Sequence, residues 1–161
     1  MKRKRILIIG PRGSGKSTLA KYINADPGPV RRVQDTIYAK ATIDVPSAYL
    51  ENTWMYRHLI ALAQDAWCVL MLFDARAKES LYSPGFAKAF RIPVIGVITH
   101  YREECTDPER VYKQCLAAGI GEETVFFDGR DATMLCACLN ELKKGKGFDE
   151  VYNRSGFARN L

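Results

Sequence analysis

The sequence has no apolar run long enough to cross a membrane. Its first apolar run, Ile6–Ile9, follows positively charged residues, as the core of a secretion signal does, but it is far too short for that role. We therefore expect no export by that route and no membrane contact. We place the protein in the cytoplasm.

Cysteine pairs of the Cys-x-x-Cys type are also missing, although the chain has 5 cysteines. A structural zinc site needs two such pairs at a suitable spacing, so this class of site is excluded. We expect the thiols to be reduced. Cys115 and Cys138 fall at apolar positions of expected helices, where we interpret them as small buried hydrophobic residues.

Dense clusters of one charge sign are sparse. The formal net charge is +6, but lysine and arginine are spread along the chain except at residues 2–5 and in the last stretch. No aromatic platform or zinc-finger motif accompanies these charges, so we do not favour nucleic acid as a partner. We interpret the charge mainly as a contribution to solubility.

Short apolar runs alternate with segments of helical periodicity, in a chain of 161 residues that is 47% hydrophobic. This length and composition suit one domain with its own core. Alternating strands and helices predict an α/β fold, with a mostly parallel sheet of about five strands and helices on both faces. The expected strands are 5–10, 38–43, 67–73, 92–98 and 124–127, and the expected helices are 17–24, 54–64, 86–90, 107–119 and one capped by Asp131.

The last part of the chain differs from the rest. Residues 1–144 form the expected domain, whereas residues 145–161 have little apolar periodicity. This tail is either a frayed end or a docking peptide, the second because Phe148, Tyr152 and Phe157 are scattered through it.

A glycine-rich motif follows the first strand. Residues 10–17 read Gly-Pro-Arg-Gly-Ser-Gly-Lys-Ser, which matches G-x-x-x-x-G-K-[ST] between an apolar strand and a helix. Glycines let the backbone N–H groups wrap around a phosphate at the positive end of the helix. The motif predicts a P-loop NTPase fold. The expected phosphate-binding residues are Gly10, Pro11, Arg12, Gly13, Ser14, Gly15, Lys16, Ser17 and Thr18.

Three side chains around this loop predict a nucleoside triphosphate with Mg²⁺ as the ligand. Lys16 can neutralise β- and γ-phosphate oxygens, and the Ser17 hydroxyl can bind Mg²⁺. Asp44 ends a probable neighbouring strand, where a carboxylate can hold Mg²⁺ directly or through water; otherwise it is a turn or cap residue. Lys16 and Arg12 are the candidate catalytic residues, although Arg12 can also simply point into water.

Several motifs resemble one known family. Residues 2–17, Thr-Ile-Asp-Val-Pro-Ser-Ala-Tyr-Leu-Glu-Asn at 42–52, and Ser-Pro-Gly-Phe with Pro-Val-Ile-Gly within 83–99 are similar to the EutP/PduV P-loop proteins of ethanolamine and propanediol utilisation. The resemblance extends to about Lys143. It implies a fold related to Ras-like GTPases and a setting at bacterial microcompartments, with their shell or enzyme proteins as partners.

The chain departs from the family pattern at the γ-phosphate. The resemblance implies that Ser47 stands where the family has a glycine whose N–H meets this phosphate. A serine there would be strained if the motif needs glycine-only backbone angles. Ala48 replaces the glutamine with which Ras-like proteins position water, so we expect slow hydrolysis. Glu51 is either a substitute for that glutamine or a carboxylate at a helix N-terminus.

The guanine-reading motif is altered too. The family pattern [NT]-Lys-x-Asp is replaced by Thr-His-Tyr-Arg at 99–102, and Arg102 cannot accept the hydrogen bonds that an aspartate accepts from guanine. His100 either stacks on a base or is a partly exposed loop residue. Asp128 or Asp131 could accept the guanine edge instead, although turn and cap roles also explain them.

Three functions remain open on this sequence. The first is a slow or degenerate GTPase-like switch, in which 30–40 and 46–52 respond to ATP or GTP. The second is a small-molecule kinase that uses ATP, with Arg31 and Arg32 in its lid. The third is a scaffold that has partly lost its nucleotide site and binds partners through its surface and tail. Enzymatic turnover, as an NTPase or a phosphotransferase, is left undecided.

Overall fold

The structure is a computed structural model that describes residues 5–25, 36–103, 106–121, 123–130 and 132–145. The expected tail and the arginines at 31 and 32 lie outside the described residues, except for Gly145. The strands are β1 (Arg5–Ile9), β2 (Ile37–Tyr38), β3 (Thr42–Asp44), β4 (Ala66–Asp74), β5 (Val94–Thr99) and β6 (Thr124–Phe127). The helices are α1 (Lys16–Asn24), α2 (Ala48–Glu51), α3 (Tyr56–Ala63), α4 (Pro108–Ala117) and α5 (Thr133–Lys143), with 3-10 turns η1 (Thr53–Met55) and η2 (Phe86–Ala89).

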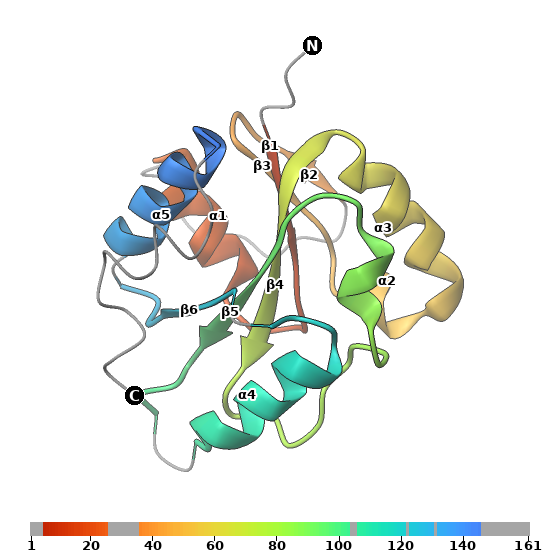
Figure 1. The fold of residues 1–161 in the computed structure, drawn as a ribbon, viewed down its shortest axis with the longest axis vertical. Helices are drawn as coiled ribbons and strands as arrows, with labels where there is room; N and C mark the ends of the chain where they lie inside the picture. The colour runs from red at the N-terminus through yellow and green to blue at the C-terminus, as the bar shows by residue number, and fades with distance from the viewer. Residues whose placement is uncertain (1–4, 26–35, 104–105, 122, 131, 146–161) are drawn as a thin grey trace.

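The described strands form one sheet in the order β2-β3-β1-β4-β5-β6 (Figure 1). All neighbouring strands are parallel except β2 and β3. The expected strand at 38–43 is therefore wrong: it is an antiparallel pair, closed by a turn in which Ala39 N–H donates to the Thr42 carbonyl at 2.8 Å. This turn explains why the described residues form a six-stranded sheet where we expected about five strands.

Helices cover both faces of the sheet, as predicted. Along β1, Leu7 and Ile9 point to one core and Ile6 and Ile8 to the other, because successive strand residues alternate in direction. Residues of α2, α3 and α4 bury themselves in the first core, and residues of α1 and α5 in the second. Figure 1 shows α1 and α5 side by side on their face of the sheet.

The helix boundaries differ from the prediction in three places. The segment 46–52, for which we expected no helix, contains α2, and the helix expected at 54–64 begins as η1 before it becomes α3. The short helix expected at 86–90 is the 3-10 turn η2. The helix expected at 107–119 is α4, and the Asp107 side chain caps it by accepting a hydrogen bond from the Arg110 N–H at 3.1 Å. Asp131 lies outside the described residues.

The cysteines behave as small hydrophobic residues where the structure describes them. Cys68, Cys115 and Cys138 are buried, Cys136 is half-buried, and none of the four is in a disulfide. Burial raises the pKa of the Cys115 thiol to about 12. Burial also raises the pKa of Cys68 and of Cys138, so these three buried thiols stay protonated at neutral pH.

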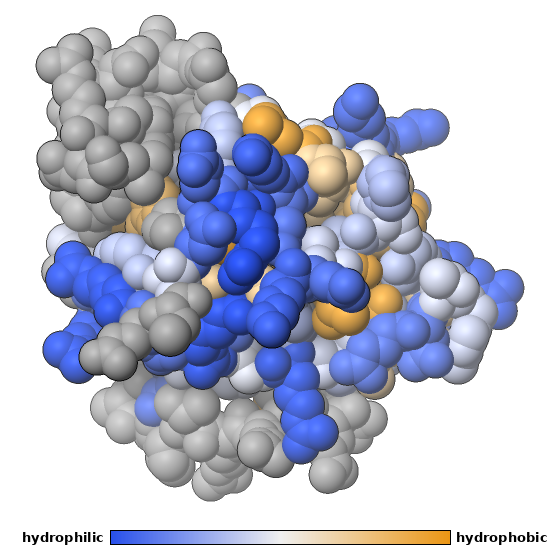
Figure 2. Space-filling model, turned by 90° about the horizontal axis from the view of Figure 1, so that it is seen from below, coloured by the Kyte–Doolittle hydropathy of each residue, from blue (hydrophilic) through white to orange (hydrophobic). Residues whose placement is uncertain are grey.

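The carboxyl ends of the parallel strands meet at one edge of the sheet, the lower edge in Figure 1. Ligands of open α/β sheets bind at this edge. Figure 2 views the molecule from that side, where hydrophilic residues predominate. Among the described helices, none is both long and apolar enough to span a membrane.

Candidate phosphate-binding site

The glycine-rich loop joins β1 to α1 at the carboxyl edge of the sheet. Gly13 and Gly15 have φ values of +75° and +96°, in the region that favours glycine. Gly10 has another role: a Cβ there would lie 2.8 Å from the Leu72 Cβ and 2.7 Å from the Ser14 Oγ. The first glycine is thus needed for close packing of the loop on β4, and the other two for its backbone path.

Because of this packing, Gly10→Ala should lower the free energy of unfolding by about 1–3 kcal/mol, as overpacking of a tight core does. Gly121→Ala is the matched control, since its Cβ would meet only the Glu123 Oε2 at 3.4 Å. Urea unfolding of both variants measures the difference. Equal stability of the two variants would show that the loop has room at position 10.

The Lys16 side chain folds back onto the phosphate loop. The residue is 8% exposed, and its Nζ donates a hydrogen bond to the Pro11 carbonyl at 3.1 Å. Burial lowers the pKa of Lys16, and the negative charges of Asp44 and Glu51 oppose that shift. A buried ammonium group with one carbonyl partner can gain further interactions from an anion.

Ser17 and Asp44, the two residues that we expect to bind Mg²⁺, contact each other across the site. Asp44 lies next to Ile8 in the β1–β3 register, and its Oδ2 accepts a hydrogen bond from the Ser17 hydroxyl at 3.0 Å. Its Oδ1 is buried and has no hydrogen-bond partner among the described residues. Burial raises the pKa of Asp44, whereas the Ser17 hydrogen bond and the charge of Lys16 oppose that rise.

This pair fits a Mg²⁺ site. Mg²⁺ takes oxygen ligands and commonly uses one or two protein groups, with phosphate and water oxygens completing the shell. Ser17 Oγ and the unpartnered Asp44 Oδ1 are oxygens of this kind. The described residues contain no cluster of three or more His, Cys, Asp or Glu that could hold a metal alone. A metal held here would therefore need ligand oxygens as well.

The remaining predicted residues lie around this centre. Arg12 is exposed, and Thr18 is half-buried on the first turn of α1. Ser47 has φ −59° and ψ −27° at the start of α2, so serine takes this conformation without strain. Glu51 is exposed at the end of α2, and its charge favours the protonated state of Lys16.

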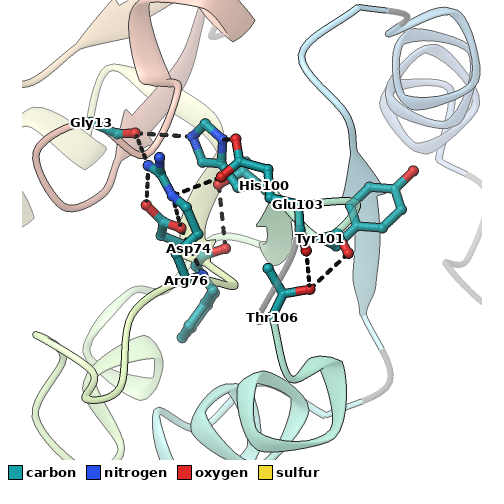
Figure 3. Close-up of polar contacts among 9 residues, drawn as sticks. Gly13, Asp74, Arg76, His100, Tyr101, Glu103 and Thr106 are labelled. Carbon is teal, nitrogen blue, oxygen red and sulfur yellow. Dashed lines mark hydrogen bonds and ion pairs between the residues drawn. The ribbon is translucent and has the colours of Figure 1, made fainter.

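A charged network beside the loop was not predicted (Figure 3). Arg76 Nη2 and His100 Nε2 both lie within hydrogen-bond distance of the Gly13 carbonyl, at 3.1 and 3.0 Å. The carboxylates of Asp74 and Glu103 flank these two side chains. The available signal was that Asp74 and Arg76 directly follow the apolar run of β4, at the edge where ligands bind.

Side chains of the segment that replaces the guanine-reading motif contact neighbouring residues. Arg102 Nε donates to the Tyr101 hydroxyl at 3.2 Å, and the Arg102 side chain is 73% exposed. Asp128 uses Oδ1 to accept from the Arg130 N–H at 2.9 Å, the turn role that we considered for it, and its Oδ2 lies 4.0 Å from Arg102 Nε.

Two solved structures share this fold. A probable GTP-binding protein, engB, superposes with a TM-score of 0.57 at 16% identity, over 87% of this chain and 97% of that one. The translation elongation factor SelB of Methanococcus maripaludis, in complex with the GTP analogue GppNHp, gives 0.55 at 15% identity. That match covers 89% of this chain and 34% of SelB. At such identities the similarity shows the fold alone.

Sequence comparison is more specific. The pattern of the family described as "Ethanolamine utilisation - propanediol utilisation" (PduV-EutP) matches residues 3–127. The propanediol utilization protein PduV of Citrobacter freundii is 33% identical over 125 residues, which is 77% of this chain and 82% of that protein. The match includes the phosphate loop and Asp44. The chain therefore belongs to the EutP/PduV family and has its P-loop α/β fold.

Proposed function

We propose that this chain is a nucleotide-dependent switch, which binds a nucleoside triphosphate with Mg²⁺ and hydrolyses it slowly. The observation that carries the proposal is the unpartnered, buried Asp44 Oδ1 beside the Ser17 hydroxyl, next to Lys16 in the phosphate loop. The site thus combines a buried cation with two metal-ligand oxygens. The names of the relatives support GTP as one ligand and propanediol utilisation as the setting.

Mg²⁺ would be held by Ser17 and Asp44 and would neutralise charge on the β- and γ-phosphates. The protein itself binds and orients the phosphates: Lys16 binds their oxygens, and the backbone N–H groups of the loop orient them. Burial of Asp44 and Lys16 keeps water away and strengthens these electrostatic interactions.

The segment after Asp44 is the proposed moving part. It consists of Val45, a turn, α2 and η1, and it lies between the metal-binding end of β3 and α3. A metal ion bound to Asp44, or a phosphate bound to the backbone N–H of Ser47, would therefore shift the position of α2. Ala48 carries no group that could orient water, which is why the proposed hydrolysis is slow.

A fluorescence experiment tests the switch. Trp54 in η1 is 64% exposed, whereas the half-buried Trp67 packs on the second core. In a Trp67→Phe variant, the emission of Trp54 should differ between the Mg²⁺ complexes of GDP and a non-hydrolysable GTP analogue. Identical emission, together with identical hydrogen exchange of residues 46–55, would contradict a switch and favour a scaffold that does not respond to nucleotide.

The base preference gives a separate prediction. Because Arg102 stands in place of the aspartate and His100 in place of the lysine, discrimination between GTP and ATP should be below about tenfold, or 1.4 kcal/mol. Guanine selectivity depends on buried polar partners that adenine leaves unpaired. Competition titrations with the two triphosphates measure it. A hundredfold preference for GTP would show that another group, such as Asp128, reads the base.

Microcompartment shell or enzyme proteins are the proposed partners, and the cytoplasm or a microcompartment the proposed location. The family is described by its role in ethanolamine and propanediol utilisation, and this description supports the proposed setting. A pull-down from cells grown on propanediol or ethanolamine, with the chain loaded with GDP or with a GTP analogue, tests both points. Recovery of shell or pathway enzymes that depends on the nucleotide is the expected result.

A further inference from the structure

Gly13 is exposed in the phosphate loop, next to the buried Ser14. A Cβ added to Gly13 or to Gly15 would meet no atom within 4 Å outside its chain neighbours. Gly13 also has a positive φ, and glycine carries the largest conformational freedom to lose on ordering. Polar contacts on the Gly13 peptide can therefore fix its orientation, and with it the direction of the next N–H group, before the ligand arrives.

The Gly13 carbonyl receives such contacts from two other segments. Arg76 follows β4 and donates through Nη2 at 3.1 Å, and His100 follows β5 and lies with Nε2 at 3.0 Å (Figure 3). His100 has a φ of +56°, an uncommon conformation for a residue other than glycine. The backbone at the end of β5 thus takes an unfavourable conformation that brings the ring onto the loop.

Carboxylates fix the orientation of both donors. Asp74 binds Arg76 twice, with Oδ1 to Nε at 3.0 Å and Oδ2 to Nη2 at 2.8 Å, and it also accepts from the Arg76 N–H at 2.9 Å. Glu103 Oε1 lies 3.1 Å from His100 Nδ1, and its Oε2 lies 3.6 Å from Arg76 Nε. The bidentate pair leaves the guanidinium of Arg76 little freedom.

Burial of Asp74 would raise its pKa, but the hydrogen bonds and charge of Arg76 outweigh this effect and leave the pKa below its ordinary value. Asp74 is therefore ionised at neutral pH. Its charge holds the Arg76 guanidinium in place against the Gly13 carbonyl.

Holding this carbonyl has a consequence inside the loop. In a trans peptide the C=O and the following N–H point in opposite directions. The Gly13 carbonyl points outward to Arg76 and His100, so the Ser14 N–H points inward, where it donates to the Pro11 carbonyl at 3.1 Å. Lys16 Nζ donates to the same carbonyl. Two donors thus converge at the position where an anion can replace the Pro11 oxygen as their partner.

We propose that Arg76 and His100 are positioning residues, which orient the Gly13–Ser14 peptide so that its N–H faces the bound phosphate. This inference rests on the proposed function, because it assigns a role in the same nucleotide site. It adds that Arg76, held by Asp74, contributes to nucleotide affinity without touching the nucleotide.

The test compares Arg76→Met with Arg91→Met by calorimetric titration of GTP in Mg²⁺. Both changes remove one arginine charge from an exposed position, but Arg91 precedes β5 and so lies at the opposite end of this strand from His100. Arg76→Met should weaken binding about tenfold, and Arg91→Met less than twofold. Melting temperatures of both variants in the absence of nucleotide check that each remains folded.

Two further measurements separate positioning from a general loss of structure. The Ser14 amide resonance in a ¹⁵N-correlation spectrum should shift in Arg76→Met and not in Arg91→Met. His100→Gln, which keeps an amide donor, should retain more affinity than His100→Ala.

These experiments separate a failure of the positioning role from a failure of the proposed function. If the wild-type chain binds no triphosphate, the proposed function fails. If the wild-type chain binds GTP but Arg76→Met binds it equally well, or the Ser14 resonance does not move, the positioning role is overturned and the proposed function stands.

Discussion

Replacing Lys16 with alanine should reduce triphosphate affinity by at least about a hundredfold, since charge-assisted hydrogen bonds to the β- and γ-phosphates would be lost. The Lys16 Nζ group donates a hydrogen bond to the Pro11 carbonyl at 3.1 Å, a partner that a phosphate oxygen can replace. Burial lowers the pKa of this lysine despite the charges of Asp44 and Glu51, so the charged form is disfavoured in the free protein. Alanine removes that cost, and the melting temperature should not fall.

The matched control is Lys21→Ala, on the same helix α1 but away from the phosphate loop. Calorimetric titration with GTP and with ATP, beside thermal unfolding, measures both effects. Unchanged affinity in Lys16→Ala would contradict the assignment of the site, and a large loss in Lys21→Ala would show that the effect is one of net charge.

Asp44→Asn and Ser17→Ala should remove most of the Mg²⁺-dependent part of binding, about tenfold or more, because each variant deletes a metal-ligand oxygen. The relevant quantity is the ratio of affinities in Mg²⁺ and in EDTA. Asp65→Asn, at an exposed position before β4, is the matched control. If the Asp44 and Ser17 variants keep the full metal effect, their hydrogen bond at 3.0 Å has only a structural role.

This metal effect should also depend on pH. Burial raises the pKa of Asp44, and Mg²⁺ binds the ionised carboxylate. The Mg²⁺-dependent gain should therefore be complete above the raised pKa and should decline as the pH falls through it. Asp44→Asn, which cannot titrate at this position, should lack this part of the pH dependence.

Local sequence patterns were sufficient for the phosphate loop and for the buried strands. Residues 10–17 match G-x-x-x-x-G-K-[ST] between a strand and a helix, and β4, β5 and β6 are apolar runs without helical periodicity. Asp44 was found because it ends such a run next to β1. These features depend on neighbours in the sequence, so one chain was enough to predict them.

Other features depend on contacts between distant segments. The network on the Gly13 carbonyl joins residues 63 and 87 positions away from it, and no periodicity relates them. The division of 38–43 into β2 and β3 was missed because a three-residue turn there carries no glycine or proline. Backbone strain at Ser47 could be excluded only from the observed φ of −59°, which the sequence does not determine.

Calorimetric titration of the wild-type chain with GTP tests the central claim most directly, namely that residues 10–17 bind the phosphates of a nucleotide with Mg²⁺. We predict saturable binding at one site, weaker in EDTA and lost in Lys16→Ala. An absence of binding heat with both GTP and ATP in Mg²⁺, from a chain whose thermal unfolding is cooperative, would contradict the account.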